Sequence, residues 1–322
     1  VDADTGAILG DAVRAHITVT FALAKVGMYQ HPGRGRCGEI IIAPIGMPAE
    51  LADSPDLRTN LTTCADAAAM LPPRGPSMHK GAASRAGAGL VFIACPESLN
   101  DILEVKCTEA LTRPMPETDQ RSLSLAAEEP IAESANHVDA VVLGPGLSQH
   151  PQTQELVRRL ARRIQRPLLL DADGLNAFAG RADDLRERPA PTVLKPHPGE
   201  FARLSGREIA VTQADRPGAA RELAASTGCI VLLKGAGTVI AEPGGDAWIN
   251  PTGSSGLASG GSGDVLSGMI GAFLAGGVGA PEAAVAGAYY HGRAAEVAAS
   301  QGTRGMVPPK LLEVLPGIFP ED

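Results

Sequence analysis

The sequence has little of three things: excess basic charge, closely spaced cysteines and unbroken hydrophobic runs. Lys and Arg number 28 against 36 Asp and Glu, and the resulting net charge of -8 argues against a nucleic-acid-binding surface. The five cysteines are far apart and show no metal-type spacing, which favours a reducing compartment. The most apolar stretch, residues 269–290, is interrupted by glycines and by Pro281, so we do not expect it to span a membrane.

The chain opens with Val1 rather than methionine, and we expect no secretory leader. We therefore expect a fragment of a longer protein, located in the cytoplasm. Its 322 residues and 44% hydrophobic content suffice for one large core or two moderate ones.

A glycine-rich segment, residues 250–268, is the most informative part of the chain. It reads NPTGSSGLASGGSGDVLSG, and its Gly261-Ser262-Gly263-Asp264 portion leads directly into apolar residues at helical spacing. Backbone amides without side chains, followed by a helix start, are typical of a phosphate-binding loop. Asp264 could then take a proton from an attacking hydroxyl or help hold a metal ion. The alternative is a turn in which Asp264 only caps the helix.

Short apolar runs that alternate with helical patterns predict a parallel sheet. We expect its strands at residues 90–94, 140–143, 168–171, 193–195 and 230–234, with earlier strands at 17–21 and 40–43 and a helix over 62–70. Ligands bind at the carboxyl ends of parallel strands, so the residues that follow each strand are the candidates for a site.

Polar or glycine-rich corners follow four of these strands. They are Gly144-Pro145-Gly146, Asp171-Ala172-Asp173-Gly174, Lys195-Pro196-His197-Pro198-Gly199-Glu200 and Lys234-Gly235-Ala236-Gly237-Thr238. Each alone has a structural explanation: a tight turn, a helix cap at Asp171 or Asp173, or a packed loop histidine at His197. Their shared position on one expected sheet edge favours a ligand site.

Together with the glycine-rich segment, these corners resemble the ADP/ATP-dependent NAD(P)H-hydrate dehydratases of the ribokinase-like superfamily, over roughly residues 61–315. The resemblance implies an α/β fold, a ribokinase-like αβα sandwich with a mostly parallel central sheet. Residues 1–50 resemble the C-terminal tail of an NAD(P)H-hydrate epimerase domain, a truncated Rossmann-like fragment. The epimerase sites would lie upstream of Val1, so no epimerase activity is expected.

The resemblance also implies a reaction: NADH or NADPH hydrated at its ring is dehydrated at the expense of ADP or ATP, with Mg²⁺ accompanying the nucleotide. The catalytic residues would be Asp264, Gly261, Ser262 and Gly263. The nucleotide-binding residues would be Lys234, Gly235, Ala236, Gly237, Thr238 and Gly263. The hydrate-binding residues would be Gly146, His197 and Asp264. For the metal, Glu200 is only a weak candidate.

The segment after Gly81 departs from the family pattern. In the family, a strand, a loop and a helix follow this point, whereas here Gly81 runs through three small residues into Arg85. We therefore expect an epimerase remnant at 1–50, a linker with its leading helix at 51–81, and a dehydratase domain at 82–322 that lacks its first strand and helix. Loss of a central strand would uncover apolar neighbours and unpaired ladder groups.

Two other functions stay open. A small-molecule kinase of the same superfamily, of hydroxymethylpyrimidine or sugar type, would use the same loop and Asp264. An inactive nucleotide-binding remnant would fit the missing strand. For the dehydratase we expect the hydrate and an adenine nucleotide as partners, a homo-oligomer, and neither nucleic acid nor membrane. The helix expected over 283–299, with His291, is more typical of core than of a subunit contact.

Overall fold

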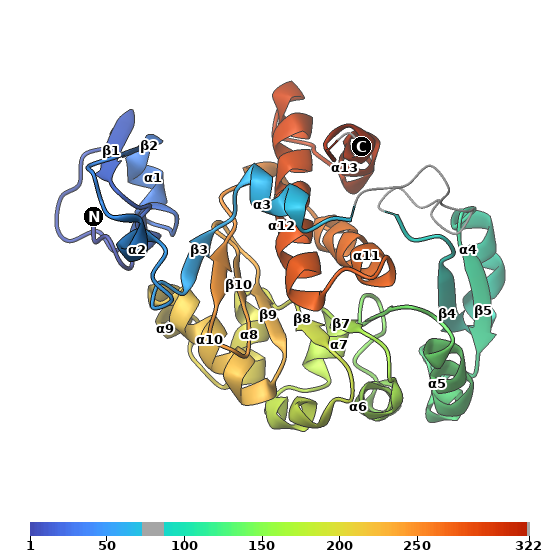
Figure 1. The fold of residues 1–322 in the computed structure, drawn as a ribbon. Helices are drawn as coiled ribbons and strands as arrows, with labels where there is room; N and C mark the ends of the chain where they lie inside the picture. The colour runs from blue at the N-terminus through green and yellow to red at the C-terminus, as the bar shows by residue number, and fades with distance from the viewer. Residues whose placement is uncertain (73–86, 321–322) are drawn as a thin grey trace.

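The computed structural model describes residues 1–72 and 87–320, and its centre is a seven-stranded sheet (Figure 1). The strand order is β3-β11-β10-β9-β8-β7-β6. The strands are β3 (Thr59–Leu61), β6 (Val141–Leu143), β7 (Leu168–Leu170), β8 (Thr192–Leu194), β9 (Ile230–Leu233), β10 (Val239–Ala241) and β11 (Ala247–Ile249). Neighbours from β6 to β9 pair in parallel, β10 is antiparallel to both of its neighbours, and β11 is parallel to β3. The mostly parallel sheet is thus confirmed.

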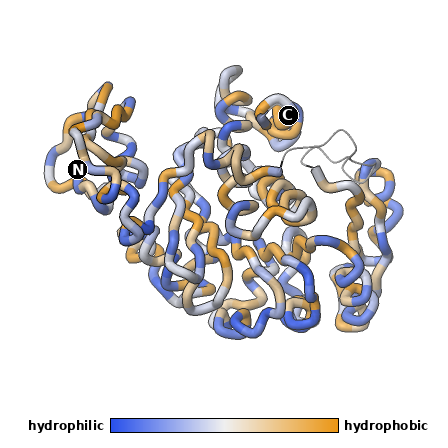
Figure 2. The backbone as a smooth tube through the Cα atoms, viewed as in Figure 1, coloured by the Kyte–Doolittle hydropathy of each residue, from blue (hydrophilic) through white to orange (hydrophobic). Residues whose placement is uncertain are grey.

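The main sheet is buried on both faces because its strands are continuous apolar runs. Side chains alternate between the faces, so that Leu168 and Leu170 join one core cluster while Leu169 joins the other. Figure 2 shows the strands as the hydrophobic centre of this part of the molecule.

Helices cover the two faces and complete the αβα sandwich. One face carries α5 (Glu128–Asn136), α6 (Pro151–Arg163), α7 (Asp173–Asn176), α8 (Pro198–Ser205) and α10 (Arg216–Thr227), with α9 (Ile209–Ala214) beside α8. The other face carries α3 (Cys64–Ala69), α11 (Ser262–Ala275), α12 (Ala280–Ala298) and α13 (Pro308–Val314). Among the described residues, none of these helices combines the length and apolar composition needed to cross a bilayer.

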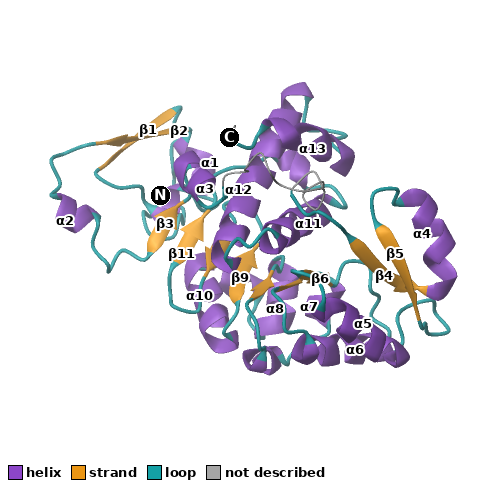
Figure 3. Ribbon diagram, turned by 45° about the vertical axis from the view of Figure 1, so that its right-hand side comes forward, coloured by secondary structure: helices purple, strands orange, loops and turns teal. Residues whose placement is uncertain are grey.

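Two small parallel sheets lie outside the main body, at opposite ends of it (Figures 1 and 3). The N-terminal one pairs β1 (Ile17–Phe21) with β2 (Glu39–Ala43), and this region also holds the helices α1 (Arg34–Cys37) and α2 (Ala49–Ala52). The other pairs β4 (Phe92–Pro96) with β5 (Leu111–Met115), beside α4 (Asn100–Lys106).

Each strand expected from the sequence lies within two residues of a strand in the structure, but one of them was assigned to the wrong sheet. The strand expected at 90–94 is β4, and it pairs with β5 instead of joining the parallel sheet. Within the described residues, no strand bridges the distance between β6 and this pair. The stretch taken as linker also supplies β3, an edge strand of the main sheet. The junction from Gly81 to Arg85, where a strand was expected to be missing, lies outside the described residues.

Candidate functional site

A buried cluster of charges joins the carboxyl ends of β7, β8 and β9. Asp171 follows β7, and its carboxylate accepts from Lys195 Nζ at 2.7 Å and from Lys234 Nζ at 3.1 Å. Ser267 Oγ on α11 donates to the same carboxylate at 2.8 Å. Lys195 is fully buried and Asp171 is only 2% exposed. One carboxylate therefore holds two ammonium groups at the rim of the sheet.

The ionisation of these groups follows from burial and from their mutual attraction. Burial opposes the charge of Asp171, but Lys195 and Lys234 outweigh it, so the pKa of Asp171 lies below its ordinary value. Burial lowers the pKa of Lys195 to about 8, although Asp171 partly offsets the effect. Burial also disfavours the charge of Lys234, yet Asp171 and Glu200 raise its pKa above the ordinary value. With Glu200 counted, two carboxylates face the two ammonium groups of this cluster.

The glycine-rich segment forms a tight turn directly above this cluster, at the start of α11. Gly261, the residue before the helix, has a left-handed backbone with φ of 86°. Lys195 Nζ donates to the carbonyl of Gly263 at 3.2 Å, and His291 Nε2 on α12 donates to the carbonyl of Ser262 at 2.9 Å. Burial lowers the pKa of His291 to about 4, so its ring is neutral. The carbonyl groups of Ser262 and Gly263 thus both accept hydrogen bonds from side chains of the protein.

The opposite, outward side of this turn offers donors and a free carboxylate. In the part of the chain that the structure describes, the backbone N–H groups of Gly261 and Gly263 make no hydrogen bond. Asp264 is exposed, and its carboxylate has no partner among the same residues. Unpaired amides at the start of a 14-residue helix, with ammonium groups beneath them, can bind an anion.

The Gly144 and Asp171 corners touch through their backbones. A side chain at Gly144, where φ is 137°, would place its Cβ 1.8 Å from the carbonyl oxygen of Asp171. Asp173 accepts from the Ser148 backbone N–H at 3.0 Å, which fixes the turn that contains the exposed Gly146. Asp171 is therefore a charged centre and not a helix cap, while Asp173 joins the two corners.

His197 and Glu200 form a capping box at the start of α8. His197 Nδ1 accepts from the Gly199 N–H at 2.9 Å, and Glu200 accepts from the His197 N–H at 2.7 Å. The imidazole itself is half-exposed, and partial burial lowers its pKa. Glu200 also faces Lys234 at 3.4 Å, so this corner is connected to the charge cluster.

No group of three or more His, Cys, Asp or Glu side chains converges as a metal site among residues 1–72 and 87–320. Glu200 is already engaged by Lys234 and by a backbone amide, and these partners would compete with a metal ion. Asp264, by contrast, is exposed at the rim and has no partner among the described residues. Such a site suits Mg²⁺ that is held mainly by phosphates and water.

The turn from Lys234 to Thr238 connects β9 to β10. Its first side chain enters the charge cluster, and Thr238 Oγ1 donates to the Gly235 carbonyl at 2.8 Å. Ala236 at the tip is exposed. Through Lys234, Asp171 and Lys195, this turn is connected by direct contacts to the turn at Gly263.

The structure adds four residues to which the sequence assigned no site role: Asp171, Lys195, Ser267 and His291. Lys195 begins the corner that runs from Lys195 to Glu200, directly after a strand. This position is the sequence signal that could have identified it as a site residue. His291 was expected to be core, and it is buried, but its ring also holds the Ser262 carbonyl. Ser267 lies one helical turn beyond Gly263, and only its contact with Asp171 reveals it.

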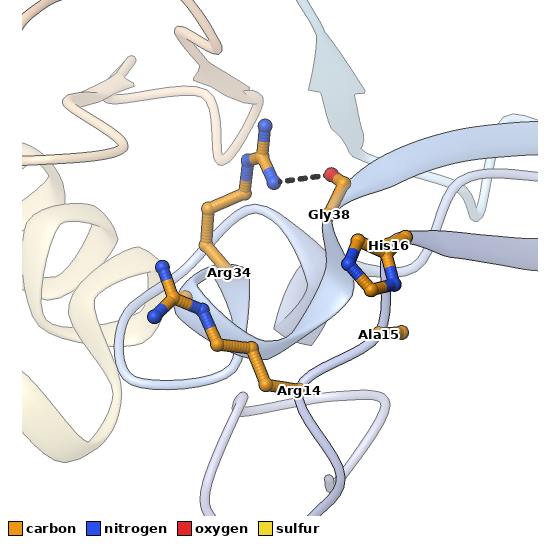
Figure 4. A pocket seen from close by; sticks show the side chains of 6 residues that line it. Arg14, Ala15, His16, Arg34 and Gly38 are labelled. Carbon is orange, nitrogen blue, oxygen red and sulfur yellow. Dashed lines mark hydrogen bonds between the residues drawn. The ribbon is translucent and has the colours of Figure 1, made fainter.

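A separate hollow of about 570 Å³ lies in the N-terminal region, away from the rim. It is lined by Arg14, Ala15, His16, Arg34, Gly35 and Gly38. Figure 4 shows the Arg34 side chain reaching toward Gly38, whose carbonyl accepts from Arg34 Nη1 at 2.8 Å. No residue of the charge cluster lines this hollow, so it is not part of the candidate site.

Comparisons with known proteins agree with the motifs. The NAD(P)H-hydrate dehydratase family profile matches residues 74–317. The bifunctional NAD(P)H-hydrate repair enzyme Nnr of Moorella thermoacetica is 42% identical over 343 aligned positions, covering 99% of this chain and 65% of that protein. Its counterpart from Thermofilum pendens is 38% identical over 340 positions, covering 98% of this chain and 64% of that protein. The chain therefore spans just under two thirds of these relatives' length.

Solved structures show the same fold. The ADP/ATP-dependent NAD(P)H-hydrate dehydratase from Bacillus subtilis, co-crystallised with ATP and Mg²⁺, is 29% identical with a TM-score of 0.68, covering 81% of this chain and 98% of that one. A ribokinase-like superfamily protein from Enterococcus faecalis, 20% identical with a TM-score of 0.67, covers 81% of this chain and 95% of its own and supports the fold alone. The chain belongs to the NAD(P)H-hydrate dehydratase family, on a ribokinase-like fold.

Proposed function

We propose that the chain catalyses the dehydration of hydrated NADH or NADPH to NADH or NADPH at the expense of ADP or ATP. The observation that carries the proposal is the turn at the start of α11. There, the N–H groups of Gly261 and Gly263 and the carboxylate of Asp264 have no partner among the described residues, and a Cβ on Gly263 would lie 3.6 Å from Lys195 Nζ and 4.0 Å from Lys234 Nζ.

Each part of the turn has a role in phosphoryl transfer. The N–H groups of Gly261 and Gly263, with Ser262 between them, bind the migrating phosphoryl group and stabilise its developing charge. Asp264 accepts the proton of the ring hydroxyl as that oxygen attacks phosphorus. The two lysines supply positive charge without touching the acceptor, because Asp171 holds them beneath the turn.

The reaction then balances in two steps. The terminal phosphoryl group moves to the ring oxygen, breaking its bond to the nucleotide and leaving AMP or ADP. The ring nitrogen next contributes its electron pair, the carbon–oxygen bond breaks, and phosphate leaves with the bonding electrons. Loss of a proton from the neighbouring ring carbon restores the double bond. Phosphate departs far more readily than hydroxide, which is why the nucleotide is consumed.

The two partners would occupy different corners of the rim. Lys234, Gly235, Ala236, Gly237 and Thr238 bind the adenine nucleotide together with Gly263. The hydrate contacts Gly146, His197 and Asp264. Mg²⁺ enters with the nucleotide phosphates and shields their charge, and Asp264 can hold it through water. The ATP and Mg²⁺ with which the Bacillus subtilis relative was crystallised support this assignment.

The domain assignment, location and assembly belong to the same proposal. Residues 1–50 are the end of an epimerase domain, 51–81 lead from it into the dehydratase part and contribute β3 and α3 to it, and 82–322 form the rest of the dehydratase domain. The protein acts in the cytoplasm as a homo-oligomer.

One observation favours an inactive nucleotide-binding remnant as the second candidate. The alignment with the Moorella relative has 343 positions, more than the 322 residues of this chain, so the relative has segments without a counterpart here. The separation of β4 and β5 from the main sheet is consistent with one such segment being a strand between them and β6.

Absorbance at long wavelength tests the proposal, because NADH and NADPH absorb there and their hydrates do not. We expect absorbance and inorganic phosphate to rise together when the chain, hydrated NADPH, Mg²⁺ and ADP or ATP are all present. Nucleotide binding without turnover would support the remnant. A stable phosphorylated product from a small alcohol, with no regenerated NADPH, would support a kinase.

A further inference from the structure

The N-terminal region contacts the turn to which we assign nucleotide binding. Gln30, 2% exposed, lies between that region and the main body. Its side-chain amide donates from Nε2 to the carbonyl of Gly237 at 3.1 Å. Its oxygen accepts from Arg216 Nε on α10, also at 3.1 Å.

Arg216 holds the other end of the same turn. It is 4% exposed, and its Nη2 donates to the carbonyl of Leu233 at 2.9 Å and to that of Lys234 at 3.3 Å. The Gln30–Arg216 pair therefore fixes the carbonyls at both ends of the turn. The backbone of Tyr29 packs so closely that a Cβ on Gly237 would lie 2.3 Å from the Tyr29 carbonyl oxygen.

The chemistry of this contact requires a side chain that both accepts and donates a hydrogen bond. A guanidinium only donates hydrogen bonds and a carbonyl only accepts them, so the residue between them must accept on one side and donate on the other. Glutamine does both and remains neutral. Because Arg216 is buried, loss of Gln30 leaves its Nε donor unpaired, although its Nη atoms still donate to Gln213 and to the carbonyls of Leu233 and Lys234.

We propose that Gln30 is a positioning residue for the nucleotide turn, and that the N-terminal region thereby sets the affinity of the dehydratase part for adenine nucleotides. The inference rests on the proposed assignment of residues 234–238. The Bacillus subtilis dehydratase aligns over 98% of its length with 81% of this chain. About a fifth of this chain therefore has no counterpart in that enzyme.

Two substitutions separate the two hydrogen bonds in the full chain. Gln30→Leu removes both. Gln30→Glu keeps an acceptor for Arg216 but cannot donate to the Gly237 carbonyl, so the region stays attached while the turn is released. Thr18→Val is the control, because Thr18 donates to the Cys37 carbonyl at 2.7 Å within the N-terminal region and does not contact the turn.

The measurements are the Kd for ADP and ATP by calorimetry, and KM and kcat by the absorbance assay. We expect both Gln30 variants to bind nucleotide about tenfold more weakly, with kcat at saturating nucleotide and KM for the hydrate unchanged. Gln30→Glu should keep the melting temperature of the parent protein, and Thr18→Val should keep its nucleotide affinity.

Unchanged nucleotide affinity in Gln30→Glu would overturn the inference, and so would an equal loss of affinity in Thr18→Val. Failure of the proposed function looks different, because the parent protein would then bind nucleotide without regenerating NADPH. The Kd comparison still decides the role of Gln30 in that case. A parent protein that binds no adenine nucleotide would overturn both.

Discussion

Parallel strand pairs occur in two very different settings in this molecule. In the main sheet, Leu168, Leu169 and Leu170 of β7 are fully buried, with helices on both sides. In the small N-terminal sheet, Phe21 of β1 is 59% exposed, and in the other small sheet Leu111 of β5 is 52% exposed. Parallel sheets are normally covered on both faces, so the outlying pairs have the surfaces of incomplete sheets.

The difference explains where the site can be built. Charges at the rim of the main sheet are removed from water and held by fixed partners, as Lys195 is by Asp171. A low-dielectric surrounding strengthens such contacts and fixes their geometry. The outlying pairs lack this cover. Substitutions at the rim should therefore have large effects, and matched substitutions in the outlying sheets small ones.

The largest effect is expected at Asp264. Asp264→Ala should lower kcat by about 10²- to 10⁴-fold, because it removes the proton acceptor, while nucleotide affinity and melting temperature stay unchanged. The exposed Asp264 has no side-chain partner in the described chain that its loss could disturb. Phosphate release in the presence of hydrated NADPH is the measurement. Asp53→Ala in the N-terminal region is the control, and a comparable loss of rate there would contradict the comparison.

The next effect is on stability, at Asp171. Asp171→Ala leaves the buried Lys195 without its carboxylate partner, leaves Lys234 with Glu200 alone, and removes the acceptor of Ser267. We expect the free energy of unfolding to fall by about 3–5 kcal/mol, measured by urea denaturation followed by the fluorescence of the single tryptophan. Glu104→Ala removes an exposed acceptor of Thr112 beside β5 and should cost less than about 0.5 kcal/mol. Equal losses would contradict the comparison.

The deprotonation of Lys195 should change catalytic activity and folding stability in opposite directions as the pH rises. Its pKa is about 8 in the folded protein and 10.5 ordinarily, so between these values the unfolded chain binds more protons and this group's contribution to stability rises with pH. Activity should do the opposite, because the charge beneath the phosphoryl turn is lost, and kcat should fall about tenfold per pH unit above about pH 8.

Rate and melting curves between about pH 6 and 10 measure the two trends. In Lys195→Arg the alkaline fall in rate should disappear, since a guanidinium keeps its proton. His291, with a pKa of about 4, stays neutral throughout this range and does not contribute. A rate that remains level to about pH 10 in the parent protein would show that the charge of Lys195 is not used.

The smallest effect is expected from an exposed apolar residue of an outlying sheet. Leu111→Thr on β5 should change the free energy of unfolding by no more than about 0.5 kcal/mol, because half of this side chain is already in water. Leu169→Ala in β7 should cost about 2–5 kcal/mol by leaving a cavity. Urea denaturation of both variants provides the test. A large cost at Leu111 would show that β5 is covered in solution, for example by another copy.

Most of the main sheet could be predicted because β7, β8 and β9 are apolar runs followed by polar corners. The strands that were missed, β3, β5, β10 and β11, have weak local signals. β10 and β11 have only three residues each. β3, Thr59–Leu61, is equally short, and β5 contains Pro114. Both are defined by pairing with distant segments, Ala247–Ile249 for β3 and Phe92–Pro96 for β5, and single-sequence patterns do not report such pairing.

The candidate site was predictable in its corners but not in its connections. The sequence placed Lys195 after a strand, yet burial of a lysine depends on a partner such as Asp171 that local spacing cannot identify. The contact between Gln30 and Gly237 joins residues 207 positions apart. Such contacts depend on how the elements pack, which is why the role of the N-terminal region emerged only from the structure.

The close approach at Gly144 has a consequence for anyone randomising this gene. Because any β-carbon there would collide with the main chain of Asp171, a saturation library at that codon should retain glycine alone among functional clones. Gly146, two positions on, has open space around it, although its φ of 71° still disfavours side chains. Comparing the substitutions tolerated at the two positions would show whether such a screen distinguishes a steric clash from an unfavourable backbone conformation.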